Sequence, residues 1–596
     1  MKAGKVAVVL LLLAAPVSAQ LASAPSAAPP AAPAVQYTVS LDDPTHHILH
    51  VRMEFRPAPD SKVQMPVWNA LYQVRDFSQY IIWLKAVDAA GGAVSTRMLD
   101  KTTWEVPSAH EVEYEVYADQ PGPFGAQLSA EHAFFNLAEI LMYPVGQQGG
   151  AMSVRFTSLP AGWKIATAMP AAGQPNTFAA RNYDHMVDSP VEIGAFREAD
   201  FNQGGAHYRV IVDSPLDVDI KAIAEIDRKL AAAETDWMQD RPFDQYTFIY
   251  HFPRRPAGGG MEHAYSTAID AGGERVEQDP GAITDITAHE FFHLWNVKRI
   301  RPQSLEPVDY TQEQYTRALW FSEGVTSAVA AHMSVRAGLA DDQHYLQGIS
   351  RAINTLESRP AHRTQSAEES SLETWFDKYP YYGQPDRSIS YYVKGELLGV
   401  LLDLAVRDAT QGKKSLRDVF LWMKDNYAKK GKFFPDSAGV EQAAEAVSGA
   451  NFKEFFTRYV AGLDALPYDR YFATVGLKLE QQAATVPDAG FRLARRTGTV
   501  ESVEPDSAAE KAGVKEGDTV LELNGKAPAG PWEAQLARMH VGDSVRLKLQ
   551  GPAGTREVTF VLSGRATINY ALVELQGATP EQRARRSAWV RGDSQP

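Results

Sequence analysis

Three residues near the middle of the chain have the types and spacing needed to hold and use a metal ion. They are His289, Glu290 and His293, in the segment His-Glu-Phe-Phe-His. On a helix, imidazoles four residues apart project from one face and converge on one ion. Zinc binds imidazole nitrogens and lowers the pKa of a bound water, whose proton a neighbouring carboxylate can take. The motif therefore predicts zinc-dependent hydrolysis, with the two histidines as ligands and Glu290 as general base.

Catalytic zinc sites use three protein ligands, so an acid or a histidine on a nearby helix is expected as the third. We choose Glu323, because it lies among aromatic residues in Leu-Trp-Phe-Ser-Glu-Gly, where an unpaired buried carboxylate would be costly. Glu313 is closer to His293 in sequence but lies in a polar stretch typical of a helix start on the surface. Asp285, one turn before His289, is either a carboxylate that orients this imidazole or a helix-start acid.

Two flanking segments carry candidate residues for substrate. The upstream segment contains Gly259, Gly260, Met261, Glu262 and His263. Glycines let a backbone edge approach a ligand closely, and extended peptides bind by adding to such an edge, where Glu262 would meet a substrate amine. The same pattern also fits a glycine turn with a surface glutamate. Downstream, the hydroxyl of Tyr391 or Tyr392 could stabilise an oxyanion near zinc, or both could be helix-start aromatics.

The elements that would position these residues indicate a multidomain α+β fold. Short alternating strands at 36–189, such as HILHVRMEF and EVEYEVYA, predict an N-terminal β-sandwich. Residues 190–330 begin with strands and become helical, which predicts an α/β catalytic domain, and residues 331–475 predict a helical domain that completes the site. Short strands and glycine turns return at 476–565, and residues 566–596 predict one strand and a short basic helix.

The N-terminus predicts export. A basic start, a short apolar run and the small residues Val-Ser-Ala at 17–19 predict a signal peptide at 1–19, cleaved after Ala19 and followed by a disordered Ala/Pro linker at 20–35. An uncleaved anchor is the alternative, although the apolar run is shorter than the roughly 20 residues that span a bilayer. No later stretch is long and apolar enough to span, so we expect no membrane span in the mature chain.

Composition excludes some partners and some chemistry. The chain has 596 residues, of which 44% are hydrophobic, and a net charge of -14, which argues against nucleic acid and anionic membranes as partners. It contains no cysteine, so a zinc site must use His, Asp and Glu, and a thiol nucleophile is excluded. Export without disulfides fits the periplasm of a Gram-negative bacterium, reached across the inner membrane.

Several motifs together resemble the glycyl aminopeptidase family, a PDZ-bearing branch of the thermolysin-like gluzincin peptidases. The matching segments are Met65–Trp68, Arg75–Phe77, Asp188–Val191, Gly259–His263, Ala288–Pro302, Leu319–Gly324 and Tyr392–Gly395. They are spread along most of the chain, and the extension HLWNVKRIRP is much more specific than the metal motif alone.

The resemblance implies a β-sandwich, a thermolysin-like catalytic domain with helical completion, and a PDZ-like domain at 476–565. It implies that Glu323 is the third zinc ligand, that Tyr392 is the transition-state tyrosine, and that the Gly-Gly-Met-Glu segment ending at Glu262 is the exopeptidase motif. It also implies a small first-residue pocket that favours Gly and Ala. Residues Asp488–Phe491 depart from the usual Gly-Leu-Gly-hydrophobic carboxylate loop of PDZ domains, so we expect this domain to be mainly structural or to position substrate weakly.

Together these observations predict an exported aminopeptidase with one Zn²⁺ per chain, acting on peptides with a free N-terminus. Glu290 and Tyr392 would be catalytic, and Glu262 would hold the substrate amine. Two alternatives stay open. The chain could be a zinc endopeptidase, if Glu262 faces solvent. It could also be a PDZ binding or scaffold protein with a vestigial peptidase site, although the intact metal ligands argue against this.

Overall fold

The computed structural model describes residues 33–69, 72–494, 498–528 and 532–594. The predicted signal peptide, and the predicted linker up to residue 32, lie outside the described residues. Within the described part of the chain, no helix has the length and apolar composition needed to cross a bilayer.

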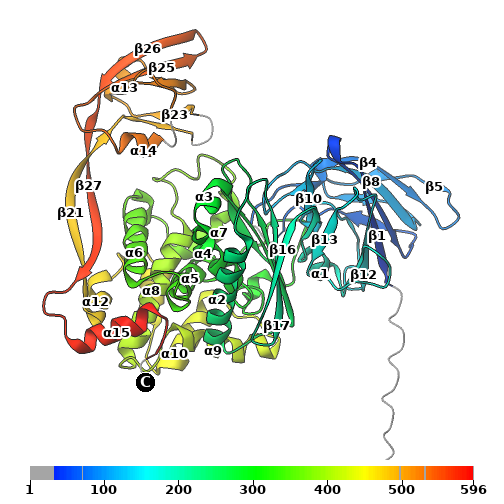
Figure 1. Cartoon of the computed structure of the whole chain (residues 1–596), viewed down its shortest axis with the longest axis horizontal. Coiled ribbons are helices and arrows are strands. Elements are labelled where there is room, and N and C mark those ends of the chain that lie inside the picture. The colour runs from blue at the N-terminus through cyan, green and yellow to red at the C-terminus, as the bar shows by residue number, and fades with distance from the viewer. Residues whose placement is uncertain (1–32, 70–71, 495–497, 529–531, 595–596) are drawn as a thin grey trace, which may run out of the picture.

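The N-terminal region consists of three sheets that share one hydrophobic core (blue to cyan in Figure 1). In β2 (Ile48–Phe55) every second side chain is buried, which is the alternation that the sequence predicts. The largest sheet runs in the order β14 (Thr177–Ala180), β12 (Met152–Thr157), β1 (Val35–Asp43), β2, β8 (Glu111–Tyr117), β4 (Ile81–Val87) and β5 (Ala93–Val94). A second sheet has the order β13 (Lys164–Thr167), β15 (Val191–Gly194), β10 (His132–Phe135) and β9 (Ala126–Leu128). The third has the order β11 (Tyr143–Pro144), β3 (Lys62–Gln64), β7 (Thr103–Glu105) and β6 (Arg97–Met98).

A mixed five-stranded sheet follows and carries the glycine-rich segment at its edge. Its strands run in the order β16 (Arg197–Gln203), β17 (Ala206–Asp213), β18 (Gln245–His251), β20 (Ser266–Ala271) and β19 (Gly258–Glu262). β18 is buried after its first residue and pairs in parallel with both neighbours, as a central strand covered on both faces does. β19 pairs antiparallel with β20 on one side, and no described strand pairs with its other edge.

Helices pack on this sheet and form the largest core of the molecule with it. The long helices are α2 (Ile220–Met238), α4 (Thr284–Phe292), α5 (Thr326–Arg336), α6 (Asp342–Glu357), α8 (Tyr391–Ala409), α9 (Leu416–Asn426) and α10 (Asp436–Ser448), green to yellow in Figure 1. Shorter ones are α3 (Gly273–Gln278), α7 (Ala367–Leu372), α11 (Lys453–Phe455) and α12 (Tyr468–Phe472), whereas α1 (Tyr183–Val187) packs in the core of the N-terminal region. One buried apolar cluster contains Tyr208 of the sheet together with Trp320, Leu401 and Phe420 of the helical part. The sheet and the helices therefore pack as one catalytic body.

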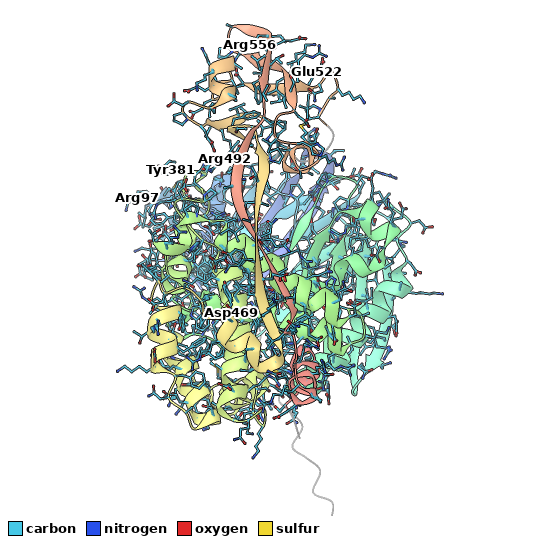
Figure 2. The ribbon with its side chains drawn as sticks, turned by 90° about the vertical axis from the view of Figure 1, so that its left-hand side faces the viewer. Arg97, Tyr381, Asp469, Arg492, Glu522 and Arg556 are labelled. Carbon is cyan, nitrogen blue, oxygen red and sulfur yellow. The ribbon has the colours of Figure 1, made fainter. Side chains whose placement is uncertain are left out.

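A long two-stranded arm leads from this body to a small domain (Figures 1 and 2). β21 (Leu477–Asp488) and β27 (Ser563–Glu574) pair antiparallel along their whole lengths, so the predicted boundary between residues 565 and 566 falls inside β27. The small domain lies between them in sequence and contains β22 (Phe491–Leu493), β23 (Val500–Val503), α13 (Ala508–Ala512), β24 (Thr519–Leu523), α14 (Trp532–Leu536), β25 (Ser544–Gly551) and β26 (Gly554–Val561). It has its own apolar core.

Several contacts tie the C-terminal part to the catalytic body. Arg492 of the small domain, labelled in Figure 2, donates a hydrogen bond to the side-chain oxygen of Gln384 at 2.7 Å. After the arm, α15 (Pro580–Val590) returns to the body, where Trp589 is fully buried. The indole of Trp237 donates a hydrogen bond to the carbonyl oxygen of Gly592 at 2.9 Å.

Candidate metal centre and active site

The structure brings the three predicted metal ligands together. His289 and His293 lie one turn apart at the end of α4, and their Nε2 atoms are 3.0 Å from each other. Glu323 comes from a short π-helix, Trp320–Val325, that leads into α5. Its Oε2 lies 3.4 Å from Nε2 of His289 and 3.2 Å from Nε2 of His293. Single π-turns of this kind are frequent at functional sites.

Hydrogen bonds at the far nitrogens orient the two imidazoles. His293 Nδ1 donates to the carbonyl oxygen of Asn296 at 2.6 Å. His289 Nδ1 lies 3.2 Å from Oγ of Ser327, whose own proton goes to the carbonyl oxygen of Glu323 at 3.2 Å. With both Nδ1 atoms protonated, both Nε2 lone pairs face the Glu323 carboxylate. Neither Ser327 nor Asn296 is predicted from the sequence, although Ser327 follows Glu323 by one helical turn.

This set of ligand atoms fits a tetrahedral zinc ion. Two imidazole lone pairs and one carboxylate oxygen face one another, and a cation removes their mutual repulsion. Zinc–ligand bonds of about 2.0–2.1 Å in tetrahedral geometry separate neighbouring ligand atoms by about 3.3 Å. The distances of 3.0, 3.2 and 3.4 Å match this spacing. Two imidazoles and one carboxylate leave the fourth position of a catalytic zinc site open.

Asp285 does not contact either metal ligand. Its carboxylate accepts a hydrogen bond from Ser334 Oγ at 3.0 Å and lies 3.6 Å from Nε2 of His344. Asp285 is exposed in the first turn of α4, where a negative charge is favourable. Of the two interpretations from the sequence, the structure therefore fits the helix-start acid.

Glu290 lies against the backbone of the edge strand. It is buried, and a Cβ atom at Gly260 would collide with its carboxylate, so the glycine makes room for it. Burial raises the pKa of Glu290 well above its ordinary value, and Glu262 and Glu323 raise it further, whereas His293 opposes the shift. A carboxylate that binds a proton readily is suited to act as a general base.

Tyr392 faces the metal centre from the start of α8. Its ring centroid lies 6.1 Å from that of His289 and 4.7 Å from that of Tyr391, on which it stacks. Tyr391 is buried, whereas Tyr392 is 39% exposed and lines the cavity next to the metal ligands. The pKa of Tyr392 lies well above its ordinary value, mainly because its hydroxyl is withdrawn from bulk water and also because Glu323 is near. The hydroxyl is therefore a neutral hydrogen-bond donor.

Two glycines set the position of Tyr392 relative to Glu323. Gly395 of α8 and Gly324 of the π-helix meet where these elements cross. A Cβ atom at Gly395 would collide with the carbonyl oxygen of Trp320 and would lie 2.9 Å from Cα of Gly324. Tyr392 precedes Gly395 by three residues and Glu323 precedes Gly324 by one, so the close backbone contact holds both functional side chains.

Gly395→Ala is expected to lower the free energy of unfolding by about 1–3 kcal/mol, the usual cost of overpacking a tight contact. Gly348→Ala on α6 is the control, because the nearest atom to its added Cβ would be the end of a flexible arginine at 3.7 Å. Thermal unfolding of both variants measures the difference. Equal melting temperatures would contradict the role of the glycine contact.

Glu262 lies at the end of β19 and faces the metal centre. It is 8% exposed, and its carboxylate together with Glu290 and His293 offers ligand atoms within 4.8 Å of one another. This second group lacks the second imidazole, so the group with His289 and Glu323 fits zinc better. A cavity of about 620 Å³ borders both groups and is lined by Tyr72, Phe124, Gly259, Gly260, Met261, Tyr392 and Glu396, among others.

Comparisons with known proteins agree with this geometry. Residues 36–195 match the Peptidase M61 N-terminal domain, residues 282–398 match the M61 glycyl aminopeptidase domain, and residues 499–551 match a PDZ domain. The chain belongs to the M61 glycyl aminopeptidase family. This confirms the resemblance, and with it the predictions of a zinc metallopeptidase and of a multidomain α+β fold with N-terminal β-sheets and a C-terminal PDZ domain.

A solved structure shares the fold of this M61 family member. An aminopeptidase N family protein from Idiomarina loihiensis is 24% identical, with a TM-score of 0.81, over 93% of this chain and 100% of that chain. An M1 zinc metallopeptidase from Deinococcus radiodurans is 15% identical, with a TM-score of 0.45, over 73% of this chain and 94% of that chain. No curated protein matches the chain.

His263 of this M61 peptidase lies behind the catalytic cavity. It is fully buried, and its Nδ1 lies 3.2 Å from Oδ1 of Asp188, which also accepts a hydrogen bond from Lys298 at 2.8 Å. Burial acts to raise the pKa of Asp188, but Lys298 and His263 hold it well below its ordinary value. These contacts fix the end of β19. The predicted contact of His263 with substrate stays a prediction.

The carboxylate loop of the PDZ domain already holds a carboxylate of its own. Asp488 Oδ1 accepts a hydrogen bond from the backbone N–H of Gly490 at 2.9 Å, and Asp488 Oδ2 lies 3.0 Å from Nε of Arg565. Backbone N–H groups in such a loop are those that capture the C-terminus of a peptide. The Asp488 contact therefore supports the expected structural role of this domain, which stays a prediction.

Proposed function

We propose that this chain is an exported zinc aminopeptidase that removes the N-terminal residue of peptides and prefers Gly and Ala at that position. The observation that carries the proposal is the position of Glu262. Its carboxylate is buried at the end of an edge strand, within 4.8 Å of ligand atoms of Glu290 and His293. Such a carboxylate can hold a substrate ammonium next to the bond to be cleaved. The signal peptide predicted at 1–19 supports export to the periplasm.

The positions of these side chains support a separate role in the reaction for each of them. A zinc ion held by His289, His293 and Glu323 would supply a water of lowered pKa and would polarise the substrate carbonyl. Glu290 takes the proton of the attacking water and passes it to the leaving amine. The Tyr392 hydroxyl donates a hydrogen bond to the carbonyl oxygen as negative charge develops there.

The edge strand supports binding of an extended peptide with a free amine. The outer edge of β19, with which no described strand pairs, would take up the substrate backbone, while Gly260 makes room for Glu290 beside it. Glu262 pairs with the ammonium, because desolvating an unpaired ammonium is costly. Tyr72, Phe124 and Met261 line the same cavity as Glu262, and we propose that these bulky side chains limit the size of the first residue.

Glu262→Ala is expected to cost about 2–4 kcal/mol in kcat/KM for free-amine peptides, the range for removing one partner of a buried charge pair. Glu396→Ala is the matched control, since it removes a carboxylate that lines the same cavity away from β19. Steady-state kinetics on Ala-initiated peptides measures both. If Glu262→Ala cleaved these peptides at the wild-type rate, another group would hold the amine and the endopeptidase alternative would gain support.

A further inference from the structure

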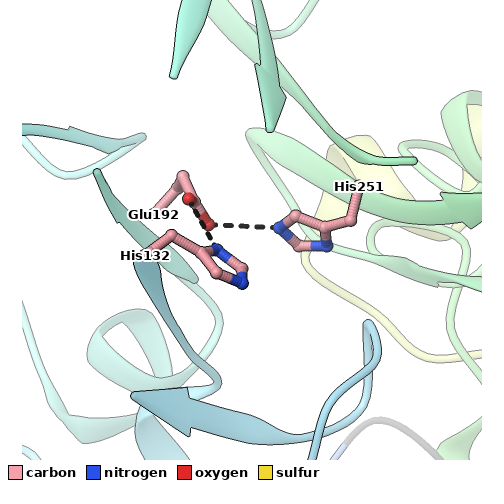
Figure 3. A group of neighbouring side chains, drawn as sticks. All are labelled: His132, Glu192 and His251. Carbon is pink, nitrogen blue, oxygen red and sulfur yellow. Dashed lines mark hydrogen bonds and ion pairs between the residues drawn. The ribbon is translucent and has the colours of Figure 1, made fainter. Parts of the chain in front are cut away.

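A second group of metal-binding side chains lies where the N-terminal region meets the mixed sheet (Figure 3). His132 is on β10, Glu192 on β15 and His251 at the end of β18. His132 Nδ1 lies 3.1 Å from Oε1 of Glu192, and His251 Nε2 lies 3.1 Å from Oε2 of the same carboxylate. The three residues offer ligand atoms within 4.8 Å of one another, and they are 9%, 0% and 7% exposed.

The His251 ring is oriented as metal-bound imidazoles usually are. Its Nδ1 lies 2.8 Å from Oδ1 of Asp270, a buried carboxylate on β20. A carboxylate at the far nitrogen fixes the proton there and turns the lone pair of Nε2 toward Glu192. Phe134 packs against the same ring, with centroids 4.7 Å apart at an interplanar angle of 73°, and so restricts its rotation.

The side chains around these rings carry an excess of negative charge that a divalent cation would balance. Glu192 is fully buried, and its two oxygens face the imidazoles of His132 and His251. Asp213 Oδ2 lies 3.6 Å from His132 Nδ1, and Arg255 lies 3.8 Å from the second oxygen of Asp270. With neutral imidazoles, the buried carboxylates of Glu192 and Asp270 carry two negative charges, whereas Asp213 and Arg255 are partly exposed. Buried charge of this size is costly unless it is balanced.

We propose that His132, Glu192 and His251 form a second zinc-binding site, distinct from the catalytic centre. Each imidazole faces a different oxygen of Glu192, so this carboxylate can chelate the ion with both oxygens. Imidazole nitrogens and carboxylate oxygens are ligands that zinc prefers when no thiolate is available.

A cavity of about 450 Å³ gives an ion access to this site and room for a water ligand. It is lined by His132, Asp213, His251 and Asp270, among others. None of the described residues that line it also lines the catalytic cavity. The two sites can therefore be loaded and mutated separately.

The position of the site indicates a structural role. His132 and Glu192 belong to the N-terminal region, whereas His251 belongs to the mixed sheet that carries β19. Beside them, the two sheets share a buried apolar cluster that includes Phe134, Ile211 and Ile249. A zinc ion bound here would link the N-terminal region to the mixed sheet at the polar end of their contact.

Metal content of the full-length chain tests the proposal. The protein is stripped with a chelator, reloaded with Zn²⁺, dialysed and analysed for zinc by mass spectrometry. We expect two zinc ions per chain in the wild type, one more than the sequence alone predicts, and one in the double variant His289→Ala/His293→Ala, which lacks the catalytic ligands. We also expect one in His132→Asn, because the asparagine amide nitrogen can donate to Glu192 in place of Nδ1 but has no lone pair for a metal. Retention of one zinc in the double variant, lost when His132→Asn is added, identifies the second site.

Thermal unfolding of the double variant gives a second readout that does not depend on activity. Zn²⁺ should raise its Tm, and this rise should disappear when His132→Asn is added. A wild type with one zinc, lost entirely in the double variant, together with a Tm of the double variant that Zn²⁺ leaves unchanged, would overturn the proposal. The cluster would then be a network of protonated imidazoles. The catalytic proposal would be unaffected, since peptidase activity of wild type and double variant tests it separately.

Discussion

Glu290→Gln is expected to lower kcat by roughly 10²–10⁴-fold, the range for loss of a general base, while the zinc content stays unchanged. Glutamine keeps the size of the side chain but cannot accept the proton. Glu290 lies outside the group of three ligand atoms that meet at 3.0–3.4 Å, so the metal should stay bound. Steady-state kinetics, with metal analysis of the same sample, measures both quantities.

Glu396→Gln is the matched control for this variant. Glu396 lines the same cavity, and burial raises its pKa to about 7, so it is a second proton-binding carboxylate near the site. It does not belong to either group of candidate ligands around His293. Its kcat should stay close to that of the wild type. Wild-type turnover by Glu290→Gln would show that the base is a different group.

Tyr392→Phe is expected to lower kcat by roughly 10²–10³-fold with little change in KM, because its hydroxyl acts only as charge develops on the carbonyl oxygen. The ring would keep its stacking on Tyr391 and its place beside His289. Binding of the ground state should therefore persist. Kinetics over a range of substrate concentrations separates the two parameters.

Tyr391→Phe is the control for the neighbouring hydroxyl. Tyr391 is buried, and its oxygen accepts a hydrogen bond from Thr374 Oγ1 at 3.2 Å. Loss of this hydroxyl should leave kcat nearly unchanged. A normal kcat with a raised KM in Tyr392→Phe would make Tyr392 a packing residue and leave the oxyanion without this donor.

The sequence was sufficient for the parts of the site that depend on local spacing. His289 and His293 had to share a helix face because they are four residues apart, and Glu323 was chosen because its aromatic neighbours predict burial. Burial of Glu323 is observed. The glycines before Glu262 predicted an edge that a ligand can approach, and β19 is the edge strand of its sheet. In each case the signal lies within a few residues of the functional group.

Other features depend on contacts that no local pattern encodes. The sequence around Glu323 predicts a helix, whereas the structure has a π-helix there, packed through Gly324 on Gly395 of α8. The β21–β27 arm pairs segments on either side of the PDZ domain, so each strand alone gives no sign of its partner. Glu192 is 60 positions from His132 and 59 from His251, and only the packing of two regions brings them together.

The most direct test of the aminopeptidase proposal compares one peptide with and without an N-terminal acetyl group, using the zinc-loaded wild-type protein. Acetylation removes the charge that Glu262 is proposed to hold and leaves the peptide bonds unchanged. We predict hydrolysis of the free Ala-initiated peptide, weaker hydrolysis of the Leu- or Phe-initiated ones, and no release of product from the acetylated form. Equal rates on the free and acetylated peptides would contradict the proposal and would make the enzyme an endopeptidase.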